Sequence, residues 1–341
     1  MVKRPTMTDL ARAAGVSIAT VDRVINRRLP VSDETAQQVV AAAEAIGFHA
    51  TGLLRRRLVE VPARRFGFLL QKRNDPFYAR FGQELAKATA AAQEIEGRSV
   101  VEFSEALVPR RIVEGLLALE KSCDAVAVVA VDHPVVAEAI EAISARGKQV
   151  FTLLSDVPTP SRRCYLAVDS RKAGRTAAWF ISRMAPANGK VGILVGSHRY
   201  ISQELTEISF RSYMREHAPH LQLLEPNFIL DDPRIAYEAV VDLLHAHRDL
   251  VAIYDCGGGR EGLVSALRDE DAVTRVVTVC NELTPETRMA LVDGTLDLVL
   301  DTPTSELARR LVQLMISACE GNRSNPEQVL IPANIFISEN L

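Results

Sequence analysis

The stretch MTDLARAAGVSIATVDRVINRRLPVSDETAQQVVAAAEAIGF, residues 7–48, decides the N-terminal fold and predicts three short helices. Thr6 and Asp9 have the spacing of a reciprocal helix cap. Gly15 follows the apolar positions of the first helix and is expected to end it, because glycine adopts left-handed backbone angles at little cost. Ser17 is the expected N-cap of the second helix. A tight turn therefore joins the first two helices.

The second helix places Val21 and Val24 on one face and leaves small groups and arginines on the other. Such a helix suits the major groove of DNA, although a generic three-helix bundle is the structural alternative. The residues expected to contact DNA are Ser17, Ile18, Ala19, Thr20, Arg23, Asn26 and Arg27, followed by Leu54, Arg55 and Arg56 in the next segment.

The pattern AxxAGVSxxTVxRVxN within this stretch resembles the helix-turn-helix headpiece of the LacI/GalR transcription regulators. One departure is Asp22, where the family usually has serine. The resemblance implies a homodimer on a palindromic operator in double-stranded DNA, most simply as a repressor. It also implies a hinge helix after the headpiece, but Ala50 stands where that segment customarily has proline. A basic solvated linker is therefore an equal alternative for that segment.

Charge is distributed unevenly along the 341 residues. The whole chain carries −3, yet residues 1–65 carry +5 and the remainder carries −8. A basic head on an acidic body fits DNA binding confined to the head. The charged fraction of 24% and the hydrophobic fraction of 48% are those of ordinary globular proteins.

The five cysteines are scattered and form no CxxC pair, so we expect neither disulfides nor a metal site. We also expect no secretory leader, no membrane contact and a cytoplasmic location, because no apolar run approaches the length of a transmembrane helix. Catalytic motifs are lacking, so the sequence predicts a protein without catalytic residues or a cofactor.

From residue 65 onward, short apolar runs alternate with amphipathic helices, which predicts an α/β body with parallel sheets. The order of elements resembles the periplasmic-binding-protein fold, the sensor body of LacI/GalR regulators. We therefore expect a headpiece (1–49), a linker (50–64) and a two-lobed body (65–341). The predicted lobes are 65–156 plus 296–325, and 163–295 plus 326–341.

That resemblance implies a ligand cleft at the carboxyl ends of the strands, with a small sugar or polyol as the effector. Carboxylates accept hydrogen bonds from adjacent hydroxyls, and aromatic rings lie against the apolar faces of sugars. The residues expected to bind ligand are Asp75, Phe77, Tyr78, Ser155, Asp156, Asp169, His198, Arg199, Glu204, Glu282 and Asp301. The alternatives are a turn, a helix cap or a packed aromatic ring, and for His198 and Arg199 an exposed pair of cations in a loop.

The run GGGREG at 257–262 offers a different interpretation. It satisfies GxGxxG, follows an apolar strand and opens a helix, so on its own it would favour a nicotinamide-dependent dehydrogenase. It comes late in the chain, however, and not in the first strand–helix unit. A solute-binding transport protein is the other alternative, because it would share the body.

Overall fold

The computed structural model describes residues 5–26, 31–48, 61–105, 107–322 and 327–341. The chain separates into two compact units, one holding the headpiece and the other holding most of the body. Each is described by itself. The predicted contacts Arg27, Leu54, Arg55 and Arg56 lie outside the described residues.

The headpiece contains the three predicted helices, α1 (Met7–Ala13), α2 (Ile18–Asn26) and α3 (Asp33–Ala45). Thr6 and Asp9 form the predicted capping box, and Gly15 has a φ of +63°. Leu10, Val21 and Val39 are fully buried in a small shared core. The spacing of apolar residues and the helix caps therefore predicted the three helices of the headpiece correctly.

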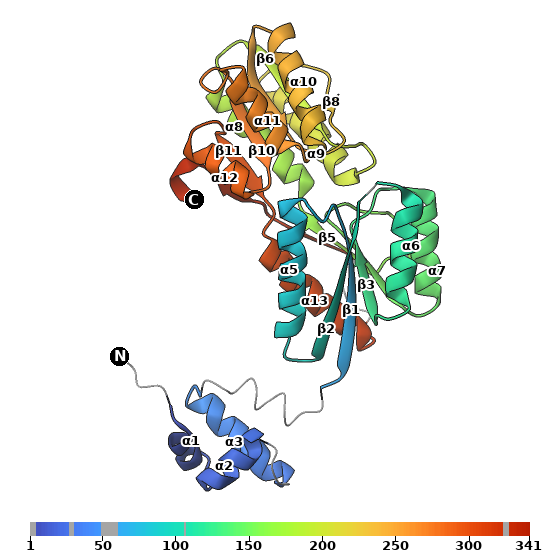
Figure 1. Ribbon diagram of the computed structural model, residues 1–341, viewed down its shortest axis with the longest axis vertical. Helices are drawn as coiled ribbons and strands as arrows, with labels where there is room; N and C mark the ends of the chain where they lie inside the picture. Colours follow the sequence, from blue (N-terminus) through green and yellow to red (C-terminus); the bar gives the residue numbers. More distant parts are fainter. Residues whose placement is uncertain (1–4, 27–30, 49–60, 106, 323–326) are drawn as a thin grey trace. The chain divides into compact units, whose positions relative to one another are not determined.

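The first lobe of the body is a sheet in the order β12-β5-β4-β3-β1-β2. The pairings from β12 to β1 are parallel. Helices α6 and α7 pack on one face around a buried apolar cluster, and Figure 1 shows α5 and α13 on the other face. The elements are β1 (Ala63–Gln71), α5 (Pro76–Ala91), β2 (Glu96–Ser104), α6 (Pro109–Glu120), β3 (Ala125–Val128), α7 (Pro134–Ala145), β4 (Gln149–Leu153), β5 (Cys164–Val168), α13 (Thr304–Cys319) and β12 (Gln328–Ile331).

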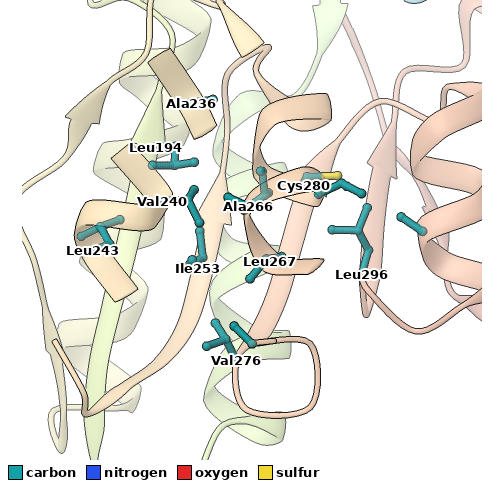
Figure 2. Packing of buried hydrophobic residues seen from close by; sticks show 14 of the residues in the cluster. Leu194, Ala236, Val240, Leu243, Ile253, Ala266, Leu267, Val276, Cys280 and Leu296 are labelled. Carbon is teal, nitrogen blue, oxygen red and sulfur yellow. The ribbon is translucent and has the colours of Figure 1, made fainter. Parts of the chain in front are cut away.

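The second lobe has the sheet order β13-β11-β10-β9-β6-β7, with β8 paired to β6. The pairs are parallel except for β11 with β13. Helices α8 and α9 share one apolar core, and α10, α11 and α12 share the other, which Figure 2 shows. The elements are α8 (Ser170–Met184), β6 (Gly189–Val195), α9 (Ile201–His217), β7 (Leu221–Leu223), β8 (Asn227–Phe228), α10 (Pro233–Ala246), β9 (Leu250–Asp255), α11 (Arg260–Asp269), β10 (Val277–Asn281), α12 (Pro285–Val292), β11 (Leu298–Asp301) and β13 (Asn334–Phe336). A short 3₁₀ helix, Ser338–Asn340, follows β13.

The predicted lobe boundaries are wrong for three strands. β5 pairs with β4 in the first lobe, although it was assigned to the second. β11 pairs with β10 in the second lobe, and β12 returns to pair with β5 in the first. Apolar runs indicate that a strand exists but not which strand it pairs with. The chain consequently passes between the lobes after β5, after β11 and after β12.

Candidate functional site

The exposed face of α2 is the candidate DNA-contacting surface of the headpiece. Ser17, Ala19, Arg23 and Asn26 are exposed, Thr20 is half-buried, and Ile18 is 49% exposed despite its apolar side chain. The Ser17 hydroxyl accepts the Thr20 N–H at 3.0 Å, which caps the helix. Asp22 accepts a hydrogen bond from the Asn26 amide at 2.6 Å, so the acid that departs from the family pattern orients a predicted contact residue.

The body contains a cavity of about 140 Å³ between its two lobes. This volume is close to the roughly 150 Å³ cavity that holds a benzene molecule in an engineered protein, so one six-membered ring fits. Its lining comes from the carboxyl ends of strands in both sheets and from the segments that follow them. Six predicted ligand-binding residues line it: Asp75, Phe77, Tyr78, Ser155, Glu282 and Asp301.

Two predicted cleft residues serve local structure instead. The Asp156 carboxylate accepts from the Thr152 hydroxyl at 2.7 Å and pairs with the Arg162 guanidinium at 2.8 Å. Asp169 caps α8 by accepting the Lys172 N–H at 3.2 Å. Neither residue lines the cavity.

The three predicted residues around the start of α9 also lie outside the cavity lining. His198 is exposed and packs edge-on against Phe228, with ring centroids 4.2 Å apart. The Arg199 and Glu204 side chains are exposed as well. Tyr200, between them, is instead the buried residue that lines the cavity, and it packs against the core of the first lobe.

Three cationic side chains make contacts between the lobes. Arg260 and Lys72 line the cavity, and Arg80 does not. Arg260 from α11 is 2% exposed, and its Nη2 lies 2.7 Å from Asp75 Oδ1 of the first lobe. Arg80 from α5 donates to Asp301 Oδ1 at 2.8 Å and to the Leu283 carbonyl at 2.9 Å. The Lys72 ammonium donates to the Asp231 carbonyl at 2.7 Å. These contacts close one lobe onto the other.

Glu282 holds the most perturbed carboxylate of the cavity lining. Its Oε1 accepts the Thr302 hydroxyl at 2.7 Å, and its Oε2 accepts the Thr302 N–H at 3.2 Å. Burial, and then the nearby charge of Asp301, raise the pKa of Glu282 to about 7. Its backbone is left-handed, with a φ of +71°.

Strained backbone gathers at this cavity. Among the described residues, six non-glycine residues have left-handed φ angles, and four of them line the cavity. These four are Lys72, Leu154, Asp231 and Glu282. Such conformations are costly for residues with a Cβ and persist where surrounding structure enforces them, commonly at ligand sites.

The GGGREG run is packed rather than open. The Gly257 N–H donates to Asp255 Oδ1 at 2.9 Å, and the Gly258 N–H donates to Asp231 Oδ1 at 2.7 Å. A Cβ on Gly262 would lie 1.8 Å from the Pro233 carbonyl oxygen, so this glycine permits α10 and α11 to pack closely. Because carboxylates occupy these two amides, they do not form an open cradle for a pyrophosphate.

Several lining residues had no sequence signal that singled them out. Asp231 follows β8, which has only two residues, and Gln71 ends β1 inside an apolar run. Arg260 was visible only as part of the glycine run. The lining residues that were not predicted and carry polar side chains are Gln71, Lys72, Ser170, Tyr200, Ser202, Gln203, Thr206, Asp231, Arg260, Asn281 and Thr302, together with the Cys256 thiol.

The structure contains no disulfide among Cys123, Cys164, Cys256, Cys280 and Cys319, all of which lie in its described part. Within the described ranges, no group of three or more His, Cys, Asp or Glu side chains is arranged to hold a metal ion. None of the helices described here is both long and apolar enough to cross a membrane.

Two family models match the chain. Residues 6–50 match the bacterial regulatory proteins of the lacI family, and residues 66–323 match the periplasmic binding protein domain. Similar proteins include the HTH-type transcriptional regulator GalS of Salmonella typhimurium, 25% identical over 77% of this chain and 75% of that protein. The regulator reg1 of Streptomyces lividans is 26% identical over 57% of this chain. The match spans little more than half, 54%, of the length of reg1.

Solved structures with the same body fold include GanP, a glucose-galactose binding protein from Geobacillus stearothermophilus. It has a TM-score of 0.74 and 18% identity, over 82% of this chain and 99% of that chain. A solute-binding protein from Agrobacterium vitis bound with α-D-tagatopyranose also has a TM-score of 0.74, with 17% identity over 81% of this chain and 95% of that one.

A helix-turn-helix headpiece and a two-lobed sensor body with a polar cavity define a class of regulators that combine the two parts in one chain. This chain belongs to the LacI/GalR family of transcription regulators.

Proposed function

We propose that the protein is a repressor that binds a palindromic operator as a homodimer and responds to a small sugar or polyol in its cavity. Closure of the lobes around the effector would change operator affinity, because a ligand that prefers one state shifts the population toward it. The proposal includes a cytoplasmic location, where operator DNA is found, and binding without catalysis.

One observation carries the proposal: a ring-sized cavity with a polar lining lies between two hinged lobes in a chain that also has a lacI-family headpiece. Carboxylates, amides and hydroxyls line the cavity beside the aromatic rings of Phe77 and Tyr78. Polyols offer hydroxyls to such groups and apolar faces to such rings. The sugar ligands named for GanP and the Agrobacterium vitis protein support this class.

The two alternatives fit the molecule less well. A solute-binding transport protein shares the body but leaves the headpiece without a use. A dehydrogenase would need the amides of the GGGREG run, and carboxylates of the protein already accept two of them.

The test has two stages. Selection from random DNA duplexes should recover a palindromic site, and fluorescence anisotropy on that site should then show a change in affinity with one sugar or polyol. Recovery of no preferred duplex would contradict the DNA-binding part. A preferred duplex whose affinity no sugar or polyol alters would contradict the effector part.

A further inference from the structure

Four carboxylates line the cavity, and two of them have a cation partner. Among the described residues, the ion pairs leave two lining carboxylates, Asp231 and Glu282, with no Lys, Arg or His nitrogen within 4.0 Å. Gly258 N–H and the Gln203 amide donate to the Asp231 carboxylate, and Thr302 is the only described residue that donates to the Glu282 carboxylate. Neutral donors therefore hold both anions.

The cations at the cavity are already engaged elsewhere. Arg260 pairs with Asp75, and Arg80 pairs with Asp301. The Lys72 ammonium donates hydrogen bonds to the backbone carbonyls of Leu230 and Asp231. Beside the two ion pairs, one ammonium and two carboxylates therefore remain, which leaves an excess of one negative charge when both carboxylates are ionised.

A separate observation also calls for a donor from the ligand. Gln71 is 1% exposed and lines the cavity, and its Nε2 donates to the Val129 carbonyl at 2.6 Å. This bond fixes the amide, yet its Oε1 has no hydrogen-bond partner. A buried acceptor left unpaired is costly, so a ligand donor at this position would be favoured.

We propose that the effector is an amine-bearing polyol, the chemical class of the amino sugars, whose ammonium group is held by Glu282 and Asp231. This inference rests on the proposed function, since it names the class of effector that the same cavity takes. An ammonium group supplies three donors and no acceptor, together with the missing positive charge. A carboxylate or phosphate on the ligand would add negative charge to a cavity that already has an excess of it.

Neighbouring groups agree with this assignment. Burial is the main cause that raises the pKa of Tyr78, followed by Tyr200 and then by the charges of Asp231, Asp75 and Glu282. Tyr78 and these three carboxylates all line the same cavity. Burial and the charge of Asp301 raise the pKa of Glu282, and a bound cation would offset both effects.

The test compares matched sugars on the purified full-length chain. The probes are D-galactosamine, D-galactose and D-galacturonate, and D-glucosamine, D-glucose and D-glucuronate, with affinities measured by calorimetry at pH 7.5. On the scaffold that binds, the amine should bind about five- to tenfold more tightly than the neutral sugar, because hydrogen bonds to charged groups are the stronger ones. The uronate should bind more weakly than either.

Substitutions assign the preference to its residues. Glu282→Gln keeps the shape of the side chain and should remove most of the preference for the amine over the neutral sugar. Asp231→Asn tests the second carboxylate in the same way, and exposed Glu204→Gln, outside the cavity, should leave the ratio unchanged. A uronate that binds best, or a ratio unaltered in both cavity variants, would overturn the inference while leaving a sugar effector in place. If none of the six sugars binds, this inference fails, and the operator-affinity screen with other sugars and polyols decides separately whether the proposed function stands.

Discussion

At the scale of single residues, Arg23 is the exposed cation in the middle of the α2 reading face. If it contacts a guanine, Arg23→Ala should weaken specific operator binding by about 1–3 kcal/mol and relax preference at one base pair. Anisotropy titrations on the selected duplex and on single-base variants measure both effects. Arg215→Ala, an exposed substitution on α9 of the body, is the matched control. Unchanged specificity in Arg23→Ala would remove this residue from the reading face.

Glu282 is the residue on which effector binding should depend most. Removing a charged partner from a ligand hydrogen bond costs about 1.5–3 kcal/mol, so Glu282→Ala should lower effector affinity by roughly one to two orders of magnitude. Calorimetry measures this change, and operator binding without effector reports whether the chain remains folded. Full effector response in this variant would place the ligand elsewhere.

From the sequence, Asp301→Ala was expected to act only on ligand binding, but the contacts of Asp301 predict a second effect. Its Oδ1 already accepts from Arg80 and from the Leu283 N–H at 2.9 Å. Asp301→Ala would therefore leave the Arg80 guanidinium without its ion-pair partner as well as altering the cavity. Its effect on ligand affinity cannot be separated from its effect on lobe closure, so Glu282 gives the cleaner test.

At the scale of elements, the α8–α9 contact depends on Gly174. A Cβ at this position would lie 2.2 Å from the Thr206 carbonyl oxygen, which belongs to the backbone of α9 and cannot rotate away. Gly174→Ala should therefore destabilise the body by about 1–3 kcal/mol through overpacking, measured by urea unfolding. On α6, a Cβ at Gly115 would meet only the side-chain end of Leu69, at 2.9 Å. Gly115→Ala should cost less, and an equal cost for both would contradict the explanation.

At the scale of the whole body, Arg80 connects the lobes. Its guanidinium belongs to the first lobe and donates to Asp301 and Leu283 of the second. Arg80→Ala should shift the free protein toward an open form and lower effector affinity several-fold, because closure then costs more. Small-angle scattering with and without effector measures the opening. Arg111→Ala, which removes an exposed ion pair within α6, is the control and should change neither property.

The pH dependence of stability also belongs to this scale. Burial raises the pKa of Glu282 from 4.5 to about 7, with Asp301 adding to the shift and Arg260 opposing it. The folded chain therefore binds a proton more tightly at this site than the unfolded chain does. The destabilising contribution of Glu282 is present above pH 7 and is relieved as the pH falls toward 4.5. Burial likewise raises the pKa of Asp255, from 3.8 to about 7, so it acts in the same direction.

Urea unfolding between pH 8 and pH 5 tests this dependence. Glu282→Gln should be more stable than the wild type at pH 8, and the difference should shrink as the pH falls. Asp255→Asn serves as a comparison for the second buried carboxylate. A stability difference between wild type and Glu282→Gln that does not vary with pH would contradict the assignment.

The sequence by itself determined the headpiece and the class of the body. Caps at Thr6 and Ser17, the left-handed turn at Gly15 and the apolar spacing of α2 act over a few residues, so they can be read along the chain. The alternation of apolar runs and helices was enough to predict a parallel α/β fold, because a strand whose two faces are both covered by helices has a continuous apolar sequence. The resemblance to the periplasmic-binding-protein fold also indicated six of the residues that line the cavity, because that fold places its ligand at the carboxyl ends of strands.

Only the tertiary structure decided which strands share a sheet and which polar groups face the cavity. β5, β11 and β12 were misassigned because pairing depends on contacts across the whole body. Asp156 and Asp169 look like ligand residues in the sequence, but local donors satisfy them. Gln71, Asp231 and Arg260 reach the cavity because lobe closure brings segments together from distant parts of the chain, and no spacing in the sequence records that closure.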